Sequence, residues 1–206
     1  MKTYPIMLDV RGRLAVVVGG GAVGLRKVRS LTAAGARVRL VARETAPDAE
    51  ADDVSVIRES YRGEHLAGAM LVFACTDDRD LNARVARDAR AIGAMVNAAD
   101  QSEDCDFYLP AVVADGDVVV AIGTGGASPA LAANLKERVA AALPEGTGEF
   151  AGALAQVRDR LKDTLPDARR RSELLRQLAD PAVFEAFRSG GADAIQRKLD
   201  ELLRKP

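Results

Sequence analysis

The feature that most constrains the fold is a regular alternation of short apolar runs and longer helical stretches between residues 14 and 98. Residues 14–18 are all apolar, as expected of a strand buried on both faces of a parallel sheet. Helices are predicted over residues 22–34 and 76–93. Further strands are predicted at residues 38–42, 54–57, 69–74 and 95–98. This order predicts βαβ units and an α/β fold with a Rossmann-type parallel sheet.

The pattern changes after residue 100. Residues 107–124 hold two β-rich runs around Asp115-Gly116, which predicts a β-hairpin. Residues 128–143 read as a helix with Ser128 as N-cap and Pro129 at the first helical position. The remaining helices are predicted at residues 150–165, 167–178, 181–188 and 192–203.

Three parts are therefore predicted. Residues 1–106 form a Rossmann-type domain, residues 107–145 form a β-hairpin/helix module, and residues 146–206 form a small all-helical domain. The middle module is too small to build its own core, so we expect it to pair with a second copy of the chain. This makes it a dimerisation module and the protein a homodimer.

Composition limits the partners. The 29 basic and 30 acidic side chains give a net charge of −1, so we expect no nucleic-acid partner and no binding to anionic membranes. No apolar run approaches the ~20 residues of a membrane span, and the first residues lack the apolar region of a signal peptide. We expect a cytoplasmic protein, with Cys75 and Cys105 as reduced core thiols. The chain has a single histidine, His65, in a loop-like segment, so we expect it at the surface. One histidine also excludes a metal site built from several His ligands.

Three glycines follow the first predicted strand with the spacing Gly19-x-Gly21-x-x-Gly24, and Ala22 and Val23 open the helix. Gly19 would permit the sharp turn, Gly21 would let a pyrophosphate approach the backbone, and Gly24 would let helix and strand pack closely. The helix N-terminus would offer free N–H groups to the phosphates. The spacing alone is weak, and a turn that binds nothing is the alternative. Its position between strand and helix favours a dinucleotide site.

The end of the second predicted strand leaves the choice of dinucleotide open. An acid usually stands there to bind the adenosine ribose. This chain has Ala42 and Arg43, with Glu44 just beyond. Arg43 could bind the 2′-phosphate of NADP, stack on adenine, or be solvated. NAD is the expected cofactor, and NADP is not excluded.

Four motifs, in their order along the chain, resemble those of the siroheme synthase N-terminal family. Members of that family are precorrin-2 dehydrogenases, and some also act as sirohydrochlorin ferrochelatases. They are "VVVGGGAVGLRKV", "ACTDDRDLNARV", "VNAAD" and "GTGGASPALA". The resemblance covers nearly the whole chain. It implies NAD-dependent oxidation of precorrin-2, a tetrapyrrole, to sirohydrochlorin in a homodimer. Whether this chain also inserts Fe²⁺ as a substrate metal stays open.

The family's catalytic aspartate matches Asp100. Asp100 follows the fifth predicted strand, at the edge where open α/β sheets bind ligands. Oxidation of a reduced tetrapyrrole transfers a hydride to nicotinamide and a proton to a base, and a carboxylate can take that proton. The same carboxylate could serve iron insertion. Without the resemblance, a turn or capping aspartate would be an equally good reading.

Other site residues are less specific. Thr76 and Asp77 could contact the nicotinamide ribose or cap the following helix, and Asn97 is a candidate cofactor contact. Ser128 could bind a substrate carboxylate beside two glycines or serve only as a cap. Three consecutive arginines, Arg169, Arg170 and Arg171, could bind substrate carboxylates, but they span about 200° of a helix. One of the three is expected on the substrate.

The competing hypothesis is a non-catalytic nucleotide-sensing Rossmann protein. Such a protein would share the glycine turn. It would leave Asp100, the "GTGGASPALA" motif and the C-terminal helices unexplained.

Overall fold

The computed structural model describes residues 3–46, 53–99 and 101–204. These residues divide into two compact units, residues 3–109 and the part of the chain from Pro110 onward. Each unit has its own core.

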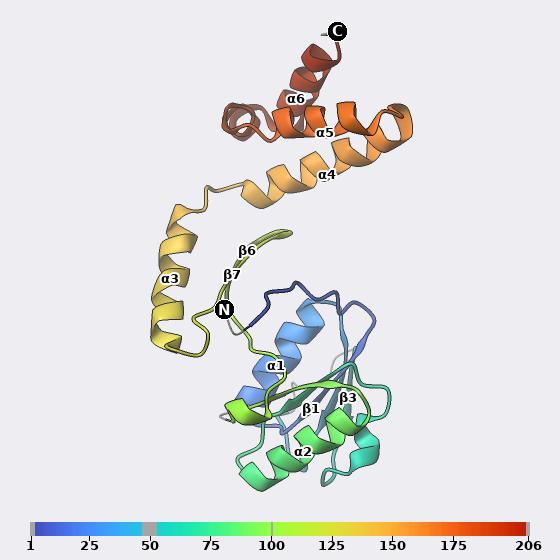
Figure 1. The fold of residues 1–206 in the computed structure, drawn as a ribbon, viewed down its shortest axis with the longest axis vertical. Helices are drawn as coiled ribbons and strands as arrows, with labels where there is room; N and C mark the ends of the chain where they lie inside the picture. Colours follow the sequence, from blue (N-terminus) through green and yellow to red (C-terminus); the bar gives the residue numbers. More distant parts are fainter. Residues whose placement is uncertain (1–2, 47–52, 100, 205–206) are drawn as a thin grey trace. The chain divides into compact units, whose positions relative to one another are not determined.

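The first unit is built on a parallel sheet with strand order β3-β2-β1-β4-β5 (Figure 1). Its core strand β1 (Leu14–Val18) pairs with β2 (Arg37–Val41) on one side and with β4 (Leu71–Ala74) on the other. The outer strands are β3 (Val54–Ile57) and β5 (Met95–Ala98). The predicted α/β fold with a Rossmann-type parallel sheet is confirmed, with strand ends shifted by up to two residues.

Two helices cover opposite faces of this sheet (Figure 1). Helix α1 (Ala22–Ala33) packs Val28 and Leu31 on the face formed by alternate residues such as Val17. Helix α2 (Arg79–Ala91) packs Val85, Ala86 and Ala89 on the other face. Both faces of β1 and β4 are therefore buried, which is why these two strands read as continuous apolar runs. Strand β2 differs, because it carries Arg37 and Arg39.

His65 corrects the sequence-based prediction of a surface histidine. It lies in the short 3₁₀ helix η2 (Gly63–Leu66) and is only 6% exposed. Its Nδ1 accepts the N–H of Arg62 at 3.1 Å, and its Nε2 lies 2.9 Å from Oε1 of Glu59. The contact with His65, assisted by Arg62, lowers the pKa of Glu59. Since both ring nitrogens have partners, burial of the imidazole is not penalised.

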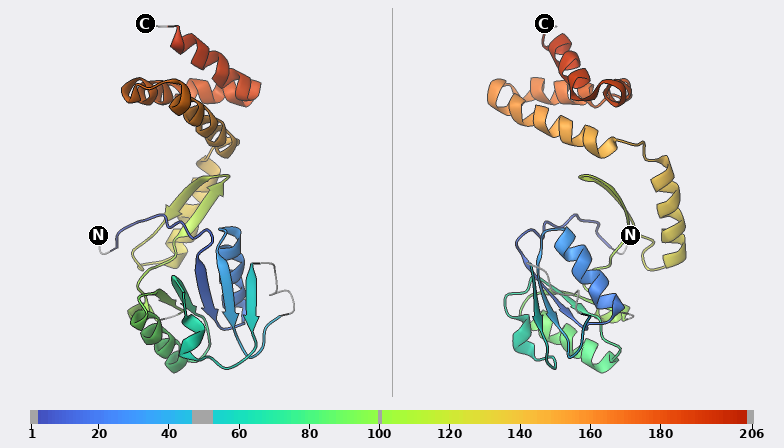
Figure 2. Two further views of the ribbon diagram at one scale, coloured as in Figure 1. Left: turned by 90° about the vertical axis from the view of Figure 1, so that its right-hand side faces the viewer. Right: turned by 180° about the vertical axis from the view of Figure 1, so that it is seen from behind.

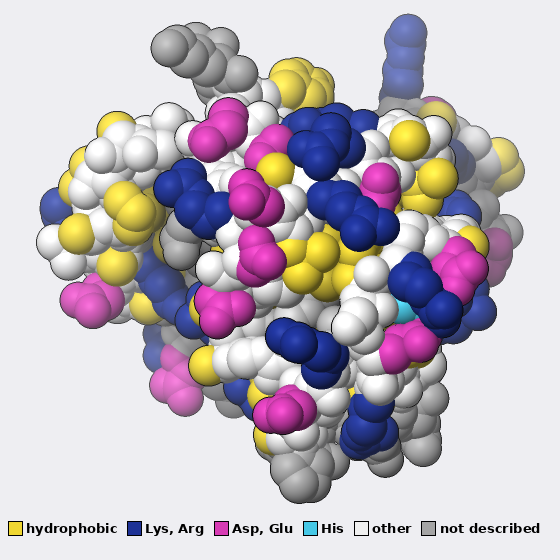
Figure 3. All heavy atoms as spheres, turned by 90° about the horizontal axis from the view of Figure 1, so that it is seen from below, with side chains coloured by type: hydrophobic (Ala, Val, Ile, Leu, Met, Phe, Trp, Pro, Cys, Tyr) yellow, Lys and Arg dark blue, Asp and Glu magenta, His cyan; other side chains and the backbone are white. Residues whose placement is uncertain are grey.

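Figure 3 is consistent with this burial, because histidine forms only a small area of the surface that it shows. On the same face, Lys and Arg side chains are interspersed with Asp and Glu.

The second unit begins with the hairpin of β6 (Ala111–Asp115) and β7 (Val118–Ile122), which is antiparallel as predicted. Gly116 takes φ +54° in its tight turn. Helix α3 (Pro129–Ala142) follows, and then α4 (Thr147–Thr164), α5 (Ala168–Leu178) and α6 (Pro181–Leu203) pack against one another (Figure 2). The core of these three helices includes Phe150, Leu174, Leu178 and Ile195.

The last two predicted helices, residues 181–188 and 192–203, are joined in α6. Its backbone nevertheless leaves the helical region at Gly191, with φ +59° and ψ −155°. The break therefore lies where the glycine pair predicted it. Across the part of the chain that the structure describes, no helix combines the length and apolar character needed to cross a membrane.

Candidate dinucleotide and substrate site

The glycine turn lies at the point where the order of the sheet reverses. Strand β1 has β2 on one side and β4 on the other, and the turn leaves its carboxyl end. The N–H of Gly19 donates to the carbonyl oxygen of Val41 at 2.9 Å, and the N–H of Cys75 donates to that of Val18 at 2.7 Å. Open α/β sheets bind ligands at this kind of crevice.

Each predicted glycine has the environment that its task requires. Gly19 takes φ +114°, and a Cβ there would lie 2.5 Å from the carbonyl oxygen of Cys75. A Cβ on Gly24 would overlap the carbonyl oxygen of Gly19. A Cβ on Gly21 would meet nothing within 4 Å. The turn therefore needs Gly19 and Gly24 for its own packing, while Gly21 leaves space on its open side for a ligand.

The first turn of α1 has no internal partner for its backbone N–H groups. Gly21 is the N-cap and supplies no side-chain acceptor, and the turn contains no acidic residue. Ala22 and Val23 are both exposed. A helix N-terminus of this kind carries a partial positive charge, so it fits the phosphates of a dinucleotide.

Sequence reasoning missed the middle glycine, Gly20. A Cβ there would overlap the carbonyl oxygen of Glu44 and lie 2.9 Å from the Cβ atoms of Ala42 and Thr45. The segment after β2 therefore packs directly on the turn. Arg43 is exposed beside it, and no carboxylate directly follows β2. The geometry suits NAD(P), and the exposed Arg43 and the missing carboxylate are compatible with both NAD and NADP.

The segment after β4 is organised by Asn82, a residue that sequence reasoning did not include in the site. Asn82 is 2% exposed; its Oδ1 accepts from the backbone N–H of Thr76 at 3.1 Å and from its hydroxyl at 2.8 Å. Its Nδ2 donates to the carbonyl oxygen of Thr76 at 2.9 Å. Asp78 caps α2 by accepting from the N–H of Leu81, whereas Asp77 is exposed. Thr76 is thus fixed from α2, and Asp77 remains open to a ligand.

Asn97 holds the segment that follows β5. Its Nδ2 donates to the carbonyl oxygen of Phe107 at 2.9 Å and lies 3.5 Å from Sγ of Cys105. The same sulfur accepts from the N–H of Ala98 at 3.2 Å. Cys75, at the end of β4, is 8% exposed, and burial raises the pKa of its thiol to about 11. Both thiols are free, and Cys75 is a core thiol as predicted, whereas Cys105 is only partly buried and its sulfur hydrogen-bonds to the backbone.

Asp100, the predicted base, lies outside the described residues. Its neighbours are described. The N–H of Ala99 donates to the carbonyl oxygen of Ala74 at 2.8 Å, at the carboxyl end of β4. Gln101 is 6% exposed and donates from Nε2 to the carbonyl oxygen of Arg79 at 3.3 Å. The chain on both sides of Asp100 is thus held at the edge that carries the glycine turn.

The nearby acids have structural partners. Asp106 accepts from Nε of Arg90 at 2.9 Å and from the N–H of Val96 at 3.0 Å. Asp104 lies 3.7 Å from Arg90 and 3.4 Å from Nε2 of Gln101. Both carboxylates therefore have partners within the protein.

Ser128 belongs to the second unit, where it caps α3. Its Oγ accepts from the N–H of Leu131 at 3.1 Å, and its own N–H donates to Oγ1 of Thr124 at 3.3 Å. Gly125 and Gly126 precede it with φ +63° and +83°. The cap alone accounts for the serine in this structure.

The three arginine side chains of the triplet have different surroundings, because consecutive residues of a helix point in different directions. Arg171 donates to the carbonyl oxygens of Leu165 at 2.5 Å and Pro166 at 2.8 Å, and Arg170 donates to that of Leu202 at 3.1 Å. Arg169 is exposed. Two of the three guanidinium groups therefore bind backbone at the ends of helices.

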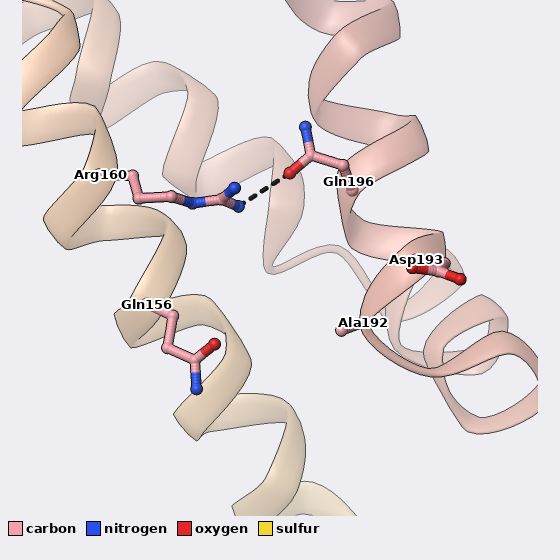
Figure 4. Close-up of a pocket in the computed structure, with 5 residues that line it drawn as sticks. All are labelled: Gln156, Arg160, Ala192, Asp193 and Gln196. Carbon is pink, nitrogen blue, oxygen red and sulfur yellow. Dashed lines mark hydrogen bonds between the residues drawn. The ribbon is translucent and has the colours of Figure 1, made fainter.

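The second unit also contains a hollow of about 440 Å³ between α4 and α6 (Figure 4). Gln156 and Arg160 point into it from α4, with Asp193 and Gln196 on α6, and Arg160 donates to Oε1 of Gln196 at 2.8 Å. Among the described residues, no three His, Cys, Asp or Glu side chains gather as metal ligands would.

Comparisons with known proteins agree with this geometry. A family model described as "Putative NAD(P)-binding" matches residues 6–111, just over half of the chain. The chain belongs to this family. A second model, the sirohaem synthase dimerisation region, matches residues 146–203.

Relatives of the whole chain are siroheme synthases. The enzyme of Pseudomonas paraeruginosa is 35% identical over 98% of this chain and 44% of its own length, and that of Azotobacter vinelandii is 36% identical over 98% and 45%. The chain thus spans less than half the length of these relatives. Together with the family models, they confirm the resemblance to the siroheme synthase N-terminal family.

A solved structure, SirC, a precorrin-2 dehydrogenase, superposes with a TM-score of 0.75 at 24% identity. It covers 97% of this chain and 100% of that one. At this identity the match establishes a shared fold.

Proposed function

We propose that the protein is an NAD-dependent dehydrogenase that oxidises precorrin-2 to sirohydrochlorin in siroheme biosynthesis. The observation that carries this proposal is the alignment of 98% of the chain with siroheme synthases, across both the nucleotide-binding and the helical parts. The glycine turn with its open Gly21 supports dinucleotide binding.

The cofactor would lie across the carboxyl edge of the sheet. Backbone N–H groups of Gly21, Ala22 and Val23 would hold the pyrophosphate, because the first turn of α1 offers N–H groups without internal partners. Gly19 and Gly24 would shape the turn around the cofactor. Bound NAD supplies a two-electron hydride acceptor. We propose NAD, with Arg43 beside the adenosine ribose; NADP is the alternative.

The nicotinamide half would lie toward β4 and β5. Thr76 and Asp77 follow β4, and Asn97 is the penultimate residue of β5, so these three are the proposed contacts there. Thr76 and Asn97 are already fixed by hydrogen bonds within the unit. This preorganisation favours one position of the ring.

Asp100 is the proposed base. Conversion of precorrin-2 to sirohydrochlorin removes two electrons and two protons, as a hydride to NAD⁺ and a proton to a carboxylate. A positioned base contributes on the order of 10²–10⁴ in rate. Its neighbours Ala99 and Gln101 are held at the carboxyl edge, which supports this role.

The remaining parts would bind substrate and a second copy. We propose residues 107–145 as the dimerisation module of a homodimer and residues 146–206 as a helical domain, which contains the matched dimerisation region. Ser128 and Arg169 are the proposed contacts for substrate carboxylates, Arg169 because it is the exposed arginine of its triplet. Sedimentation at micromolar concentration tests the dimer, and a monomer would contradict it.

The decisive assay is anaerobic incubation with precorrin-2 and NAD or NADP, followed by sirohydrochlorin absorbance. We expect turnover in the wild type and a loss of about 10²–10⁴ in Asp100→Asn, with NAD affinity unchanged. Asp104→Asn is the matched control and should stay near wild type. Binding of NAD without turnover would favour a nucleotide sensor. The same assay with sirohydrochlorin and Fe²⁺ or Co²⁺ tests metal insertion.

A further inference from the structure

Lys27 is a cation that the roles above leave unexplained. It lies in the second turn of α1 and is half-buried, with Nζ 6.0 Å from the centre of the Phe73 ring. Within the described residues no carboxylate forms an ion pair with it. Most lysines place their ammonium group in water, so this position needs an explanation.

The surroundings of Lys27 compensate its charge poorly. Burial lowers the pKa of Lys27, because it disfavours the charged ammonium. The nearby thiol of Cys75 has its pKa raised to about 11, so it is neutral at pH 7 and offers no counter-charge. Phe73 lies at the outer limit of cation–π distance. The ammonium group therefore has the environment of a cation that lacks its anion.

Lys27 lies beside the proposed site. The carbonyl group of Cys75 packs on Gly19, at the glycine turn. Phe73 meets Phe107 edge-to-face with centroids 5.5 Å apart, and Asn97 donates to the carbonyl oxygen of Phe107. Helical side chains also point back toward the helix N-terminus. The long side chain of Lys27 thus runs toward the carboxyl ends of β4 and β5.

We propose that Lys27 binds a carboxylate of the tetrapyrrole substrate at this edge. The inference rests on the proposed function, which supplies a substrate with many carboxylates. The dinucleotide pyrophosphate is the other oxyanion within the same chemistry. The first-turn N–H groups of α1 already suit that group, whereas Lys27 lies over Phe73 in β4. The substrate is therefore the better partner.

The test compares Lys27→Met and Lys27→Arg with Arg29→Met, a matched change at an exposed residue of the same helix. Anaerobic absorbance titration measures sirohydrochlorin binding, calorimetry measures NAD binding, and turnover gives KM and kcat for precorrin-2. Circular dichroism confirms that each variant folds.

In Lys27→Met we expect the Kd for sirohydrochlorin and the KM for precorrin-2 to rise about 10- to 100-fold, because one charge-assisted contact is lost. The Kd for NAD should stay within about twofold, since Lys27 is not assigned to the cofactor. Lys27→Arg should restore part of the affinity, and Arg29→Met should behave as wild type.

Unchanged sirohydrochlorin binding in Lys27→Met would overturn the proposal. Loss of NAD affinity instead would assign Lys27 to the pyrophosphate and also overturn it. If the wild type binds sirohydrochlorin but does not oxidise precorrin-2, the proposed dehydrogenase fails while the titration still decides on Lys27. A wild type that binds no sirohydrochlorin would overturn both.

Discussion

Gly21→Val separates the fold of the glycine turn from its ligand. Gly21 has φ −74° and ψ 179°, an extended conformation that valine adopts readily, and a Cβ there meets nothing within 4 Å. We therefore expect the free energy of unfolding to change by less than about 1 kcal/mol. The added isopropyl group would occupy the space that a pyrophosphate needs.

The expected loss of affinity follows from the contacts it would block. A hydrogen bond to a charged group contributes about 1.5–3 kcal/mol net, so displacing one or two such bonds costs about 3 kcal/mol. This corresponds to an increase of about 150-fold in the Kd for NAD. Isothermal titration calorimetry on the folded variant measures it.

Gly24→Ala is the contrasting change. Its Cβ would overlap the carbonyl oxygen of Gly19 and lie 3.4 Å from Cγ1 of Val17. Overpacking of this kind costs about 1–3 kcal/mol, so the melting temperature should fall by several degrees. Gly152→Val, at an open position in α4, controls for a general effect of valine. A folded Gly21→Val variant with wild-type NAD affinity would refute the assignment of the turn to the cofactor.

Three further changes test the supports of the site. Asn82→Ala should cost about 2–3 kcal/mol in urea unfolding, because it removes the hydrogen bonds that the buried Asn82 makes with the partly buried backbone of Thr76. A loss below about 0.5 kcal/mol would contradict this reading. Asp78→Ala should cost about 1 kcal/mol through loss of the α2 cap, measured in the same way. Burial raises the pKa of Cys75 from 9.0 to about 11, so the native state retains this proton longer than the unfolded chain. This difference in pKa contributes about 2–3 kcal/mol to the free energy of unfolding; the contribution is present below pH 9 and is lost as the pH rises to 11. Urea unfolding should show a shallower decline in Cys75→Ala over that range, and an equal decline in both proteins would exclude the effect.

Local patterns predicted the elements because each depends on residues close in the chain. The apolar run of β1 predicted a strand buried on both faces, and Ser128 with Pro129 predicted the start of α3. Gly191 separated two helical stretches, and the backbone of α6 breaks there. The glycine turn was predictable for the same reason, since its strand, turn and helix are consecutive.

Contacts between distant segments were not predictable in this way. The sequence predicted a solvated His65, because it does not show that Glu59 and Arg62 provide hydrogen-bond partners for both ring nitrogens. Gly20 has to be a glycine because the segment after β2 packs against it and leaves no room for a Cβ. Asn82 lies on α2 but organises Thr76 at the end of β4.

The sequence by itself therefore determined the alternation of strands and helices, the Rossmann-type sheet and the place of the glycine turn. These follow from periodicity, turn chemistry and the handedness of βαβ units. Only the tertiary structure decided which polar side chains are already committed to the protein, as Arg170, Arg171 and Asn82 are, and which stay available, as Arg169 does. The physical reason is that a side chain's hydrogen-bond partners come from whichever segments the fold brings beside it, and burial enforces that pairing.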